Sequence, residues 1–261
     1  MSQEAILKAI LFDCDGVLAE TEGDGHRVAF NNTFRDFGVD AYWDMEEYGR
    51  LLKVGGGKER MTHFFRSDQL KYPPERFDDE FIVKLHKAKT ESFAEMCVGI
   101  QGRPGVRRIM EDAAKEGISI FVCSTSNEKS VANIANSVLQ GEEKRIITKI
   151  YAGDVVSAKK PAPDIYLLAL KEYGLDPKSC LVIEDTRIGM QAAIAAGINC
   201  FITRSFYNMD EDFDGAVAVV DCFGDKDTPC NPVFGVPAST QYITLDILRR
   251  SADRKGLGIR D

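Results

Sequence analysis

The stretch that decides the fold is Ala9-Ile10-Leu11-Phe12-Asp13-Cys14-Asp15-Gly16-Val17. Its first four residues are all apolar, whereas a strand with one face in water alternates apolar and polar residues. The run therefore predicts a strand buried on both faces, as in a parallel sheet. It ends abruptly in Asp13 and Asp15, whose side chains point to the same side of an extended chain.

Further apolar runs predict the other strands of this sheet. They lie at residues 118–123, 146–152, 180–183, 200–203 and 216–220, and helical patterns separate them at 106–115, 130–139, 164–173 and 188–196. Strand–helix alternation predicts an α/β protein with an open, doubly wound parallel sheet. Ligands of such sheets bind at the carboxyl ends of the strands, so polar residues that follow the strands are the first candidates for a site.

Residues from about 19 to 102 interrupt the alternation. They contain amphipathic helical patterns, such as 26–37 and 81–96, and no convincing buried strand. We therefore expect an α/β core domain from residues 1–18 and 103–261, with an α-helical domain inserted at residues 19–102. The core closes with a turn-rich stretch beyond Cys222 and a predicted helix at 243–250.

Composition excludes several classes of function. The chain has 33 Lys and Arg against 41 Asp and Glu, a net charge of -8 that disfavours nucleic-acid binding. Its 7 Cys are scattered without a CxxC, and with only 3 His they indicate reduced thiols rather than a zinc site. No apolar run approaches the roughly 20 residues of a membrane span. We expect a soluble intracellular protein of the plastid stroma or cytoplasm, with a monomer as the simplest assembly and no membrane partner.

Paired carboxylates are the first chemical signal. Asp13 and Asp15 follow one buried strand, and Glu184-Asp185 end another. Close carboxylates repel each other unless a cation or a proton lies between them, and Mg²⁺ takes oxygen ligands. The alternative is that the first pair is only a polar exit from a strand into a turn.

A serine and a lysine supply the second signal. Ser124 follows the strand at 118–123, where it could simply cap the next helix. Lys160 precedes Pro161 and the helical pattern at 164–173. A solvated pair with Lys159 is the alternative for Lys160.

The order of these clusters resembles the four signature motifs of the haloacid dehalogenase (HAD) superfamily. The resemblance implies a Rossmann-like core, a small phosphate ester as substrate, Mg²⁺ as cofactor and an aspartyl-phosphate intermediate. It implies catalytic roles for Asp13, Asp15, Ser124 and Lys160, and a Mg²⁺ site made by Asp13, Asp15, Glu184 and Asp185. Dehalogenation, another chemistry of the superfamily, needs neither a general acid nor a metal, so these acidic residues favour phosphate.

By the same resemblance, each catalytic residue has a role. Asp13 is the nucleophile, and Asp15 protonates the leaving oxygen and then takes a proton from water. The backbone carbonyl of Asp15 also binds Mg²⁺. Ser124 donates a hydrogen bond to the phosphoryl group, and Lys160 neutralises its charge.

An insertion directly after the first motif resembles the helical cap of the β-phosphoglucomutase-like group, which governs substrate specificity. In its segment 53–60, three glycines let backbone N–H groups converge on an anion beside basic side chains. The substrate-binding candidates are Glu22, Gly56, Gly57, Lys58, Arg60 and Lys89 in the insertion, with Thr125 and Asn127 in the core. The alternatives are a flexible turn for the glycine segment and an exposed helix face for Lys89.

Segments 24–27, 55–61 and 123–129 resemble the CbbY branch, known as xylulose-1,5-bisphosphate phosphatases that remove an inhibitor of Rubisco. Two separate cationic anchors also suggest a sugar with two phosphates. Three alternatives stay open: a β-phosphoglucomutase-like phosphomutase, a phosphatase of another small phosphate ester, and a non-catalytic sugar-phosphate-binding protein. The usual His of the mutase is offset here, because Gly25 occupies its place and His26 follows.

Overall fold

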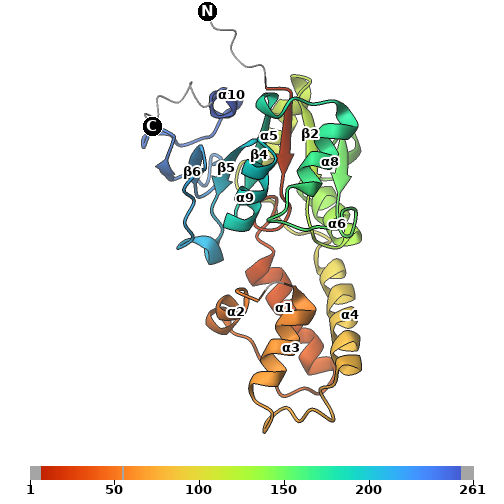
Figure 1. Cartoon of the computed structure of the whole chain (residues 1–261). Coiled ribbons are helices and arrows are strands. Elements are labelled where there is room, and N and C mark those ends of the chain that lie inside the picture. Colours follow the sequence, from red (N-terminus) through yellow and green to blue (C-terminus); the bar gives the residue numbers. More distant parts are fainter. Residues whose placement is uncertain (1–6, 55, 254–261) are drawn as a thin grey trace, which may run out of the picture. The chain divides into compact units, whose positions relative to one another are not determined.

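The computed structural model describes residues 7–54 and 56–253. The chain divides into two compact units (Figure 1). Residues 1–20 and 99–261 form the core unit, and residues 21–98 form the inserted unit. In the described ranges no helix combines the length and the apolar character that crossing a membrane requires.

Within the described residues, the core unit holds a seven-stranded sheet in the order β3-β2-β1-β4-β5-β6-β7 (Figure 1). The strands are β1 (Ala9–Phe12), β2 (Ser119–Cys123), β3 (Lys149–Tyr151), β4 (Cys180–Glu184), β5 (Asn199–Thr203), β6 (Ala218–Val220) and β7 (Pro232–Phe234). The first six are parallel, and β7 runs antiparallel to β6. Every residue of β1 and β4 is buried. The predicted α/β class with a doubly wound parallel sheet is confirmed.

Helices cover the sheet of the core unit. They are α5 (Val106–Lys115), α6 (Glu128–Val138), α7 (Glu143–Ile146), α8 (Asp164–Tyr173), α9 (Arg187–Ala195) and α10 (Leu245–Ala252). Alternate strand residues face opposite sides, and one set, including Leu11 and Val182, packs with α8 and α9 residues such as Tyr166 and Met190 in one buried cluster. Helices α5 and α10 contact each other and the strands β2, β4 and β5.

Two strand predictions need correction. The predicted strand at 146–152 is too long, because Ile146 ends helix α7 and β3 begins only at Lys149. A short apolar run fits a buried helical turn as well as a strand, so its pattern alone does not separate the two. Strand β7 was not predicted, because Pro232 and its exposed neighbours resemble a turn rather than a buried strand.

The turn-rich stretch beyond Cys222 is part of the core unit rather than a loose tail. The Arg108 guanidinium of α5 donates hydrogen bonds to the carbonyls of Ile243 (2.9 Å), Phe223 (3.1 Å) and Gly224 (2.8 Å). Gly224 has φ +73°, and a Cβ there would lie 2.3 Å from the carbonyl oxygen of Gln241. Only glycine fits such a close approach of two backbone segments.

The inserted unit is helical. It contains a π-helical turn (Glu22–His26), α1 (Arg27–Asp36), α2 (Met45–Leu51), α3 (Gly57–Ser67) and α4 (Asp79–Met96). Buried aromatic rings form its centre, with Trp43 packed against Phe30 (4.6 Å between ring centroids) and Phe34 (5.0 Å). The side chains of Asp44 and Asp78 cap α2 and α4 by accepting backbone hydrogen bonds. Gly55, a member of the predicted glycine segment, lies outside the described residues.

Candidate active site

The acidic cluster forms where two adjacent strands end. Phe12 of β1 pairs in register with Ile183 of β4, so the next residues, Asp13 and Glu184, lie side by side. One carboxylate oxygen from each of Asp13, Glu184 and Asp185 lies within 4.8 Å of the others. Residues 171 positions apart in the chain thus meet at the carboxyl edge of the sheet.

Lys160 is buried in this cluster. Its ammonium donates hydrogen bonds to Asp13 Oδ1 (2.5 Å), Glu184 Oε1 (2.7 Å) and the carbonyl of Cys123 (2.8 Å), and its side chain is 5% exposed. Burial lowers the pKa of a lysine, but the charges of Asp13 and Glu184 raise the pKa of Lys160 well above its ordinary value. The alternative of a solvated lysine pair is therefore wrong for Lys160, whereas Lys159 is half exposed and pairs with Asp154.

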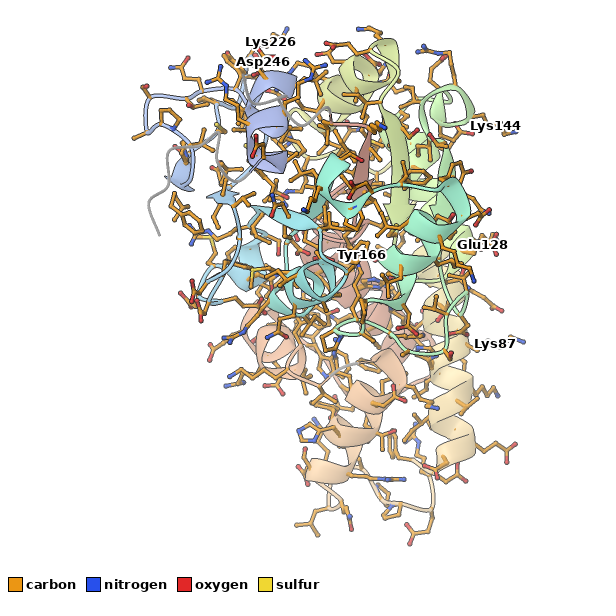
Figure 2. The ribbon with its side chains drawn as sticks, turned by 45° about the horizontal axis from the view of Figure 1, so that its top comes forward. Lys87, Glu128, Lys144, Tyr166, Lys226 and Asp246 are labelled. Carbon is orange, nitrogen blue, oxygen red and sulfur yellow. The ribbon has the colours of Figure 1, made fainter. Side chains whose placement is uncertain are left out.

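Glu184 is held more tightly than the other two acids. Its Oε1 accepts from Lys160 and from the Tyr166 hydroxyl (3.2 Å), and Tyr166 is fully buried on α8 (Figure 2). Its Oε2 accepts from the backbone amides of Asp185 (3.1 Å) and Thr186 (3.2 Å) and from the Thr186 hydroxyl (3.0 Å). Asp13 and Asp185 accept fewer hydrogen bonds, so they have more capacity left for a metal ion.

The charges of the cluster fit a divalent cation. Burial, reinforced by the charges of Glu184 and Asp15 and opposed by Lys160, raises the pKa of Asp13 to about 7. Burial and the charges of Glu184 and Asp13 also raise the pKa of Asp185 well above its usual range. Three carboxylates thus lie together with one buried ammonium, which contacts only Asp13 and Glu184 among them. A hard cation with oxygen ligands would relieve this repulsion.

The loop after β2 supplies hydroxyl groups to the same edge. The Ser126 hydroxyl donates to Asp15 Oδ2 (2.5 Å), and the Ser126 amide donates to the Ser124 hydroxyl oxygen (3.1 Å). The N-cap of α6 is Asn127, whose side chain accepts from the Lys129 amide (3.0 Å). The helix-cap alternative for Ser124 is therefore wrong, and the side-chain oxygen of Asn127, predicted to bind substrate, is committed to the cap.

In the inserted unit, the predicted residues Glu22 and Arg60 are both hydrogen-bonded to the hydroxyl of Tyr48. The Tyr48 hydroxyl donates to Glu22 Oε2 (2.5 Å), and it accepts from Arg60 Nη1 (3.1 Å). Arg60 is 8% exposed and also donates to the carbonyl of Leu51 (3.1 Å). Tyr48 was not among the predicted site residues.

Lys89 is surrounded by a different set of side chains in the same unit. Its ammonium lies 2.6 Å from His26 Nδ1 and over the rings of Phe30 (4.6 Å) and Phe93 (4.9 Å). Lys89 is 6% exposed, so the alternative of an exposed helix face is wrong for it. Lys87, two positions earlier, does point outward from α4 (Figure 2).

The other predicted residues lie at more open positions. Gly56, with φ +86°, is the N-cap of α3, and Gly57 is its first residue. The Lys58 side chain is half exposed and lies 3.7 Å from Glu59. Thr125 is exposed in the loop after β2.

Residues 7–197 match the family described as haloacid dehalogenase-like hydrolase. This chain belongs to that HAD hydrolase family. It is 49% identical over 224 residues to a CBBY-like protein of Arabidopsis thaliana, covering 83% of this chain and 69% of the relative. It is 41% identical to Protein CbbY of Cereibacter sphaeroides, covering 84% of this chain and 94% of the relative.

Solved structures agree with this family assignment. A variant of CbbY from Rhodobacter sphaeroides in complex with xylulose-(1,5)bisphosphate superposes with a TM-score of 0.72 at 38% identity, covering 83% of this chain and 95% of that one. A putative beta-phosphoglucomutase from Thermotoga maritima has a TM-score of 0.61 at 24% identity over 82% of this chain and 94% of that one, and so shares the fold. The resemblance to HAD hydrolases and to their CbbY branch is confirmed.

Arg103 plays a part in this HAD hydrolase that the sequence did not predict. Its guanidinium donates to the backbone carbonyls of Gly16, Thr203 (3.0 Å), Arg204 (2.6 Å) and Asp221. It thereby ties the loop that carries Asp15 to the ends of β5 and β6.

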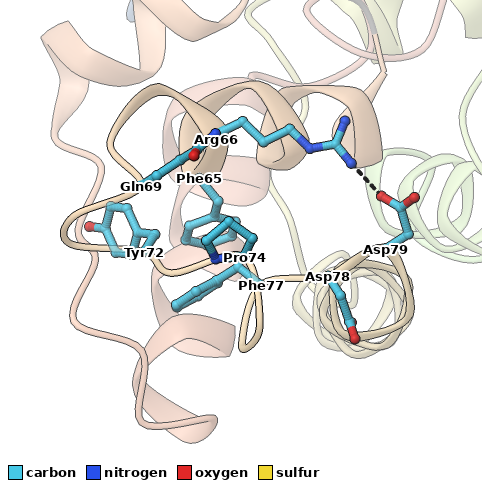
Figure 3. A pocket seen from close by; sticks show the side chains of 8 residues that line it. All are labelled: Phe65, Arg66, Gln69, Tyr72, Pro74, Phe77, Asp78 and Asp79. Carbon is cyan, nitrogen blue, oxygen red and sulfur yellow. Dashed lines mark hydrogen bonds and ion pairs between the residues drawn. The ribbon is translucent and has the colours of Figure 1, made fainter.

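A separate pocket of about 280 Å³ lies in the inserted unit (Figure 3). The rings of Phe65, Tyr72 and Phe77 line it, and an ion pair between Arg66 and Asp79 (2.6 Å) lies at its side. None of the predicted substrate-binding residues lines this pocket, so it is not the predicted anion site.

Proposed function

We propose that this chain is a Mg²⁺-dependent phosphatase that hydrolyses xylulose-1,5-bisphosphate to xylulose-5-phosphate through an aspartyl-phosphate on Asp13. The observation that carries the proposal is the Asp13 carboxylate, held 2.5 Å from the Lys160 ammonium within a buried acidic cluster. A carboxylate oriented by a buried cation is suited to attack phosphorus, because the same cation offsets the charge of the approaching phosphoryl group.

The reaction is a two-step transfer. An Asp13 oxygen bonds to phosphorus while the ester P–O bond breaks, and the sugar oxygen leaves with a proton from Asp15. Water then attacks the phosphoryl group and gives a proton to Asp15, so that phosphate departs and Asp13 is regenerated. The Ser126 hydroxyl, 2.5 Å from Asp15 Oδ2, orients the acid, and Ser124 donates to a phosphoryl oxygen.

The metal has a defined place in this proposal. Asp13 and Asp185, with Glu184 beside them and the backbone carbonyl of Asp15, would hold Mg²⁺. When bound, the ion supplies positive charge against the phosphoryl oxygens and cancels the repulsion among the carboxylates. The charges of Asp13 and Glu184 raise the pKa of Lys160 well above its ordinary value, which favours its ionised form.

The inserted unit supports the choice of a bisphosphate. Its buried cations, Arg60 and Lys89, together with the N-terminus of α3 at Gly56 and Gly57 and the exposed Lys58, are suited to recognise a second phosphate. Glu22 and Thr125 are kept in the proposal as substrate-binding candidates. The 38% identity to a CbbY crystallised with xylulose-(1,5)bisphosphate supports the same substrate.

A substrate panel tests the proposal. Phosphate release with Mg²⁺ is measured on xylulose-1,5-bisphosphate, ribulose-1,5-bisphosphate, xylulose-5-phosphate, β-glucose-1-phosphate and phosphoglycolate, and products are identified by ³¹P NMR. We expect xylulose-1,5-bisphosphate to have the highest kcat/KM and xylulose-5-phosphate to accumulate. Fastest turnover of phosphoglycolate would overturn the substrate, and isomerised sugar phosphate without free phosphate would instead establish a mutase.

A further inference from the structure

The loop that follows β5 reaches the metal-binding edge from a part of the chain that carries none of the four motifs. Asn208 lies in a short 3-10 turn (Phe206–Asn208), and its side-chain Nδ2 donates to Asp185 Oδ2 at 2.7 Å. The same Nδ2 donates to the Ser205 hydroxyl oxygen at 2.7 Å, and Ser205 is only 2% exposed. Both amide hydrogens of Asn208 are therefore used, which fixes its own orientation.

Gly16 lies close to Asp185 on another side. Gly16 has φ +73°, and a Cβ built on it would lie 2.0 Å from Asp185 Oδ2. The carboxylate oxygen thus lies directly against the backbone of the loop that carries Asp15. Asp185 is 3% exposed, so neither contact competes with bulk water.

We infer that Asn208 is a positioning residue that turns the Asp185 carboxylate toward the metal ion. The terminal torsion of an aspartate is soft, and a donor fixed on one oxygen sets the plane in which the other can bind a cation. A neutral amide suits this task, since a lysine or arginine there would repel the ion that the carboxylate binds. The inference rests on the proposed Mg²⁺ dependence.

The position of Asn208 in the chain explains why the motifs do not include it. The fourth motif ends at Asp185, and the residues that match the family end at 197. Asn208 is placed by β5, which pairs in register with β4, and by the Ser205 hydroxyl. The metal site of this chain therefore extends beyond its motifs.

The chain offers a matched control. Asn231 also donates its Nδ2 to a carboxylate, Asp221 Oδ2, at 2.6 Å in the same unit, but Asp221 is not part of the acidic cluster. Asn208→Leu and Asn231→Leu each remove one amide–carboxylate hydrogen bond and keep a branched side chain of similar size, and Asn208→Leu also removes the hydrogen bond to the Ser205 hydroxyl. A general loss of stability would affect both variants alike.

Mn²⁺ binding to the full-length protein, followed by the electron paramagnetic resonance signal of free Mn²⁺, measures the effect. We expect Asn208→Leu to raise the Mn²⁺ Kd about tenfold, within the roughly 10- to 100-fold range of metal outer-shell partners, and Asn231→Leu to leave it within about twofold. In phosphate-release assays, the Mg²⁺ concentration for half-maximal rate should rise in parallel for Asn208→Leu. Its kcat at saturating Mg²⁺ should fall by a smaller factor than its Mg²⁺ affinity, because added metal compensates for part of the weaker binding.

Two results would overturn the inference, and they can be told apart. Equal Mn²⁺ affinity in the wild type and Asn208→Leu would remove the positioning role and leave the proposed function intact. No Mn²⁺ binding by the wild type, with phosphate release unaffected by EDTA, would remove the metal from the proposed function and the inference together.

Discussion

The two units bury positive charge against different kinds of partner. In the core unit, the Lys160 ammonium lies against two carboxylates, 2.5 and 2.7 Å away, within a group of three buried acids. In the inserted unit, Lys89 lies against His26 and two aromatic rings, and Arg60 against a phenol and a backbone carbonyl. Carboxylates neutralise a cation, whereas rings, phenols and carbonyls stabilise it and leave its charge in place. The core cluster is thus suited to gain a cation. In the inserted unit, Arg60 is linked to the Glu22 carboxylate through the Tyr48 hydroxyl, and Lys89 packs on aromatic rings.

The largest effect should come from the nucleophile. Asn in place of Asp13 keeps the shape of the side chain but cannot form the acyl phosphate, so Asp13→Asn should lower kcat at least about 1,000-fold. Phosphate release under saturating substrate and Mg²⁺ measures the loss, with circular dichroism as the check of folding. Retained phosphate release would contradict the role of Asp13 as nucleophile, because the acidic cluster of the core unit would then not be the reaction centre.

The next effect is on stability and concerns the charge imbalance of the core. Burial raises the pKa of Asp13 to about 7 in the folded protein from its ordinary value of 3.8, so the folded state holds a proton that the unfolded state releases between these values. In EDTA, stability should therefore fall as pH rises from about 4 to 7. The whole difference corresponds to roughly 4 kcal/mol at about 1.4 kcal/mol per pKa unit, which is an upper limit.

Urea unfolding across this pH range, compared between wild type and Asp13→Asn, isolates the contribution of Asp13 protonation to the free energy of unfolding. The variant has no carboxylate to titrate at this position, so its stability should fall less steeply with pH. Saturating Mg²⁺ should flatten the wild-type curve, since the ion replaces the proton. Identical slopes in the two proteins without metal would contradict the charge imbalance.

The inserted unit should show a smaller effect, restricted to one class of substrate. Lys89→Met keeps the packing against the rings and removes the charge, so kcat/KM for the bisphosphate should fall about 10- to 100-fold, mainly through KM. Lys87→Met, on the exposed face of the same helix, is the matched control and should be neutral. An equal loss in both variants, or a loss in kcat alone, would show that Lys89 does not recognise the second phosphate.

The same contrast explains what could be predicted from the sequence. Asp13, Lys160 and Glu184-Asp185 follow from strand ends and known motifs, because parallel strands deliver their carboxyl ends to one edge. Ser126, Arg103 and Asn208 could not be found in this way. Each acts on a residue 23 or more positions away, and each resembles an ordinary polar loop residue until strand register brings it to its partner.

In the inserted unit, the sequence predicted which cationic residues are candidates but not the residues that they contact. Arg60 and Lys89 were identified as cationic candidates, but the structure places them with different partners, Tyr48 and His26. Neither partner follows from helical spacing, because packing rather than periodicity brings α4 against the π-helical turn that ends at His26, and Tyr48 of α2 beside Arg60 of α3. The proposed role of this unit in substrate specificity remains a prediction.

The smallest effect concerns a neutral donor in the core unit, the Ser126 hydroxyl, which donates to Asp15 as the Tyr48 hydroxyl donates to Glu22 in the inserted unit. The Ser126 hydroxyl is 2.5 Å from Asp15 Oδ2, and a hydrogen bond to a charged group contributes about 1.5–3 kcal/mol. Part of this is recovered by water at a half-buried site, so Ser126→Ala should lower kcat about 5- to 10-fold with little change in Mn²⁺ affinity. Ser126→Thr keeps the hydroxyl and should recover most of the rate. If Ser126→Ala instead weakens Mn²⁺ binding and leaves kcat unchanged, then Ser126 contributes to metal binding rather than to orienting the Asp15 side chain.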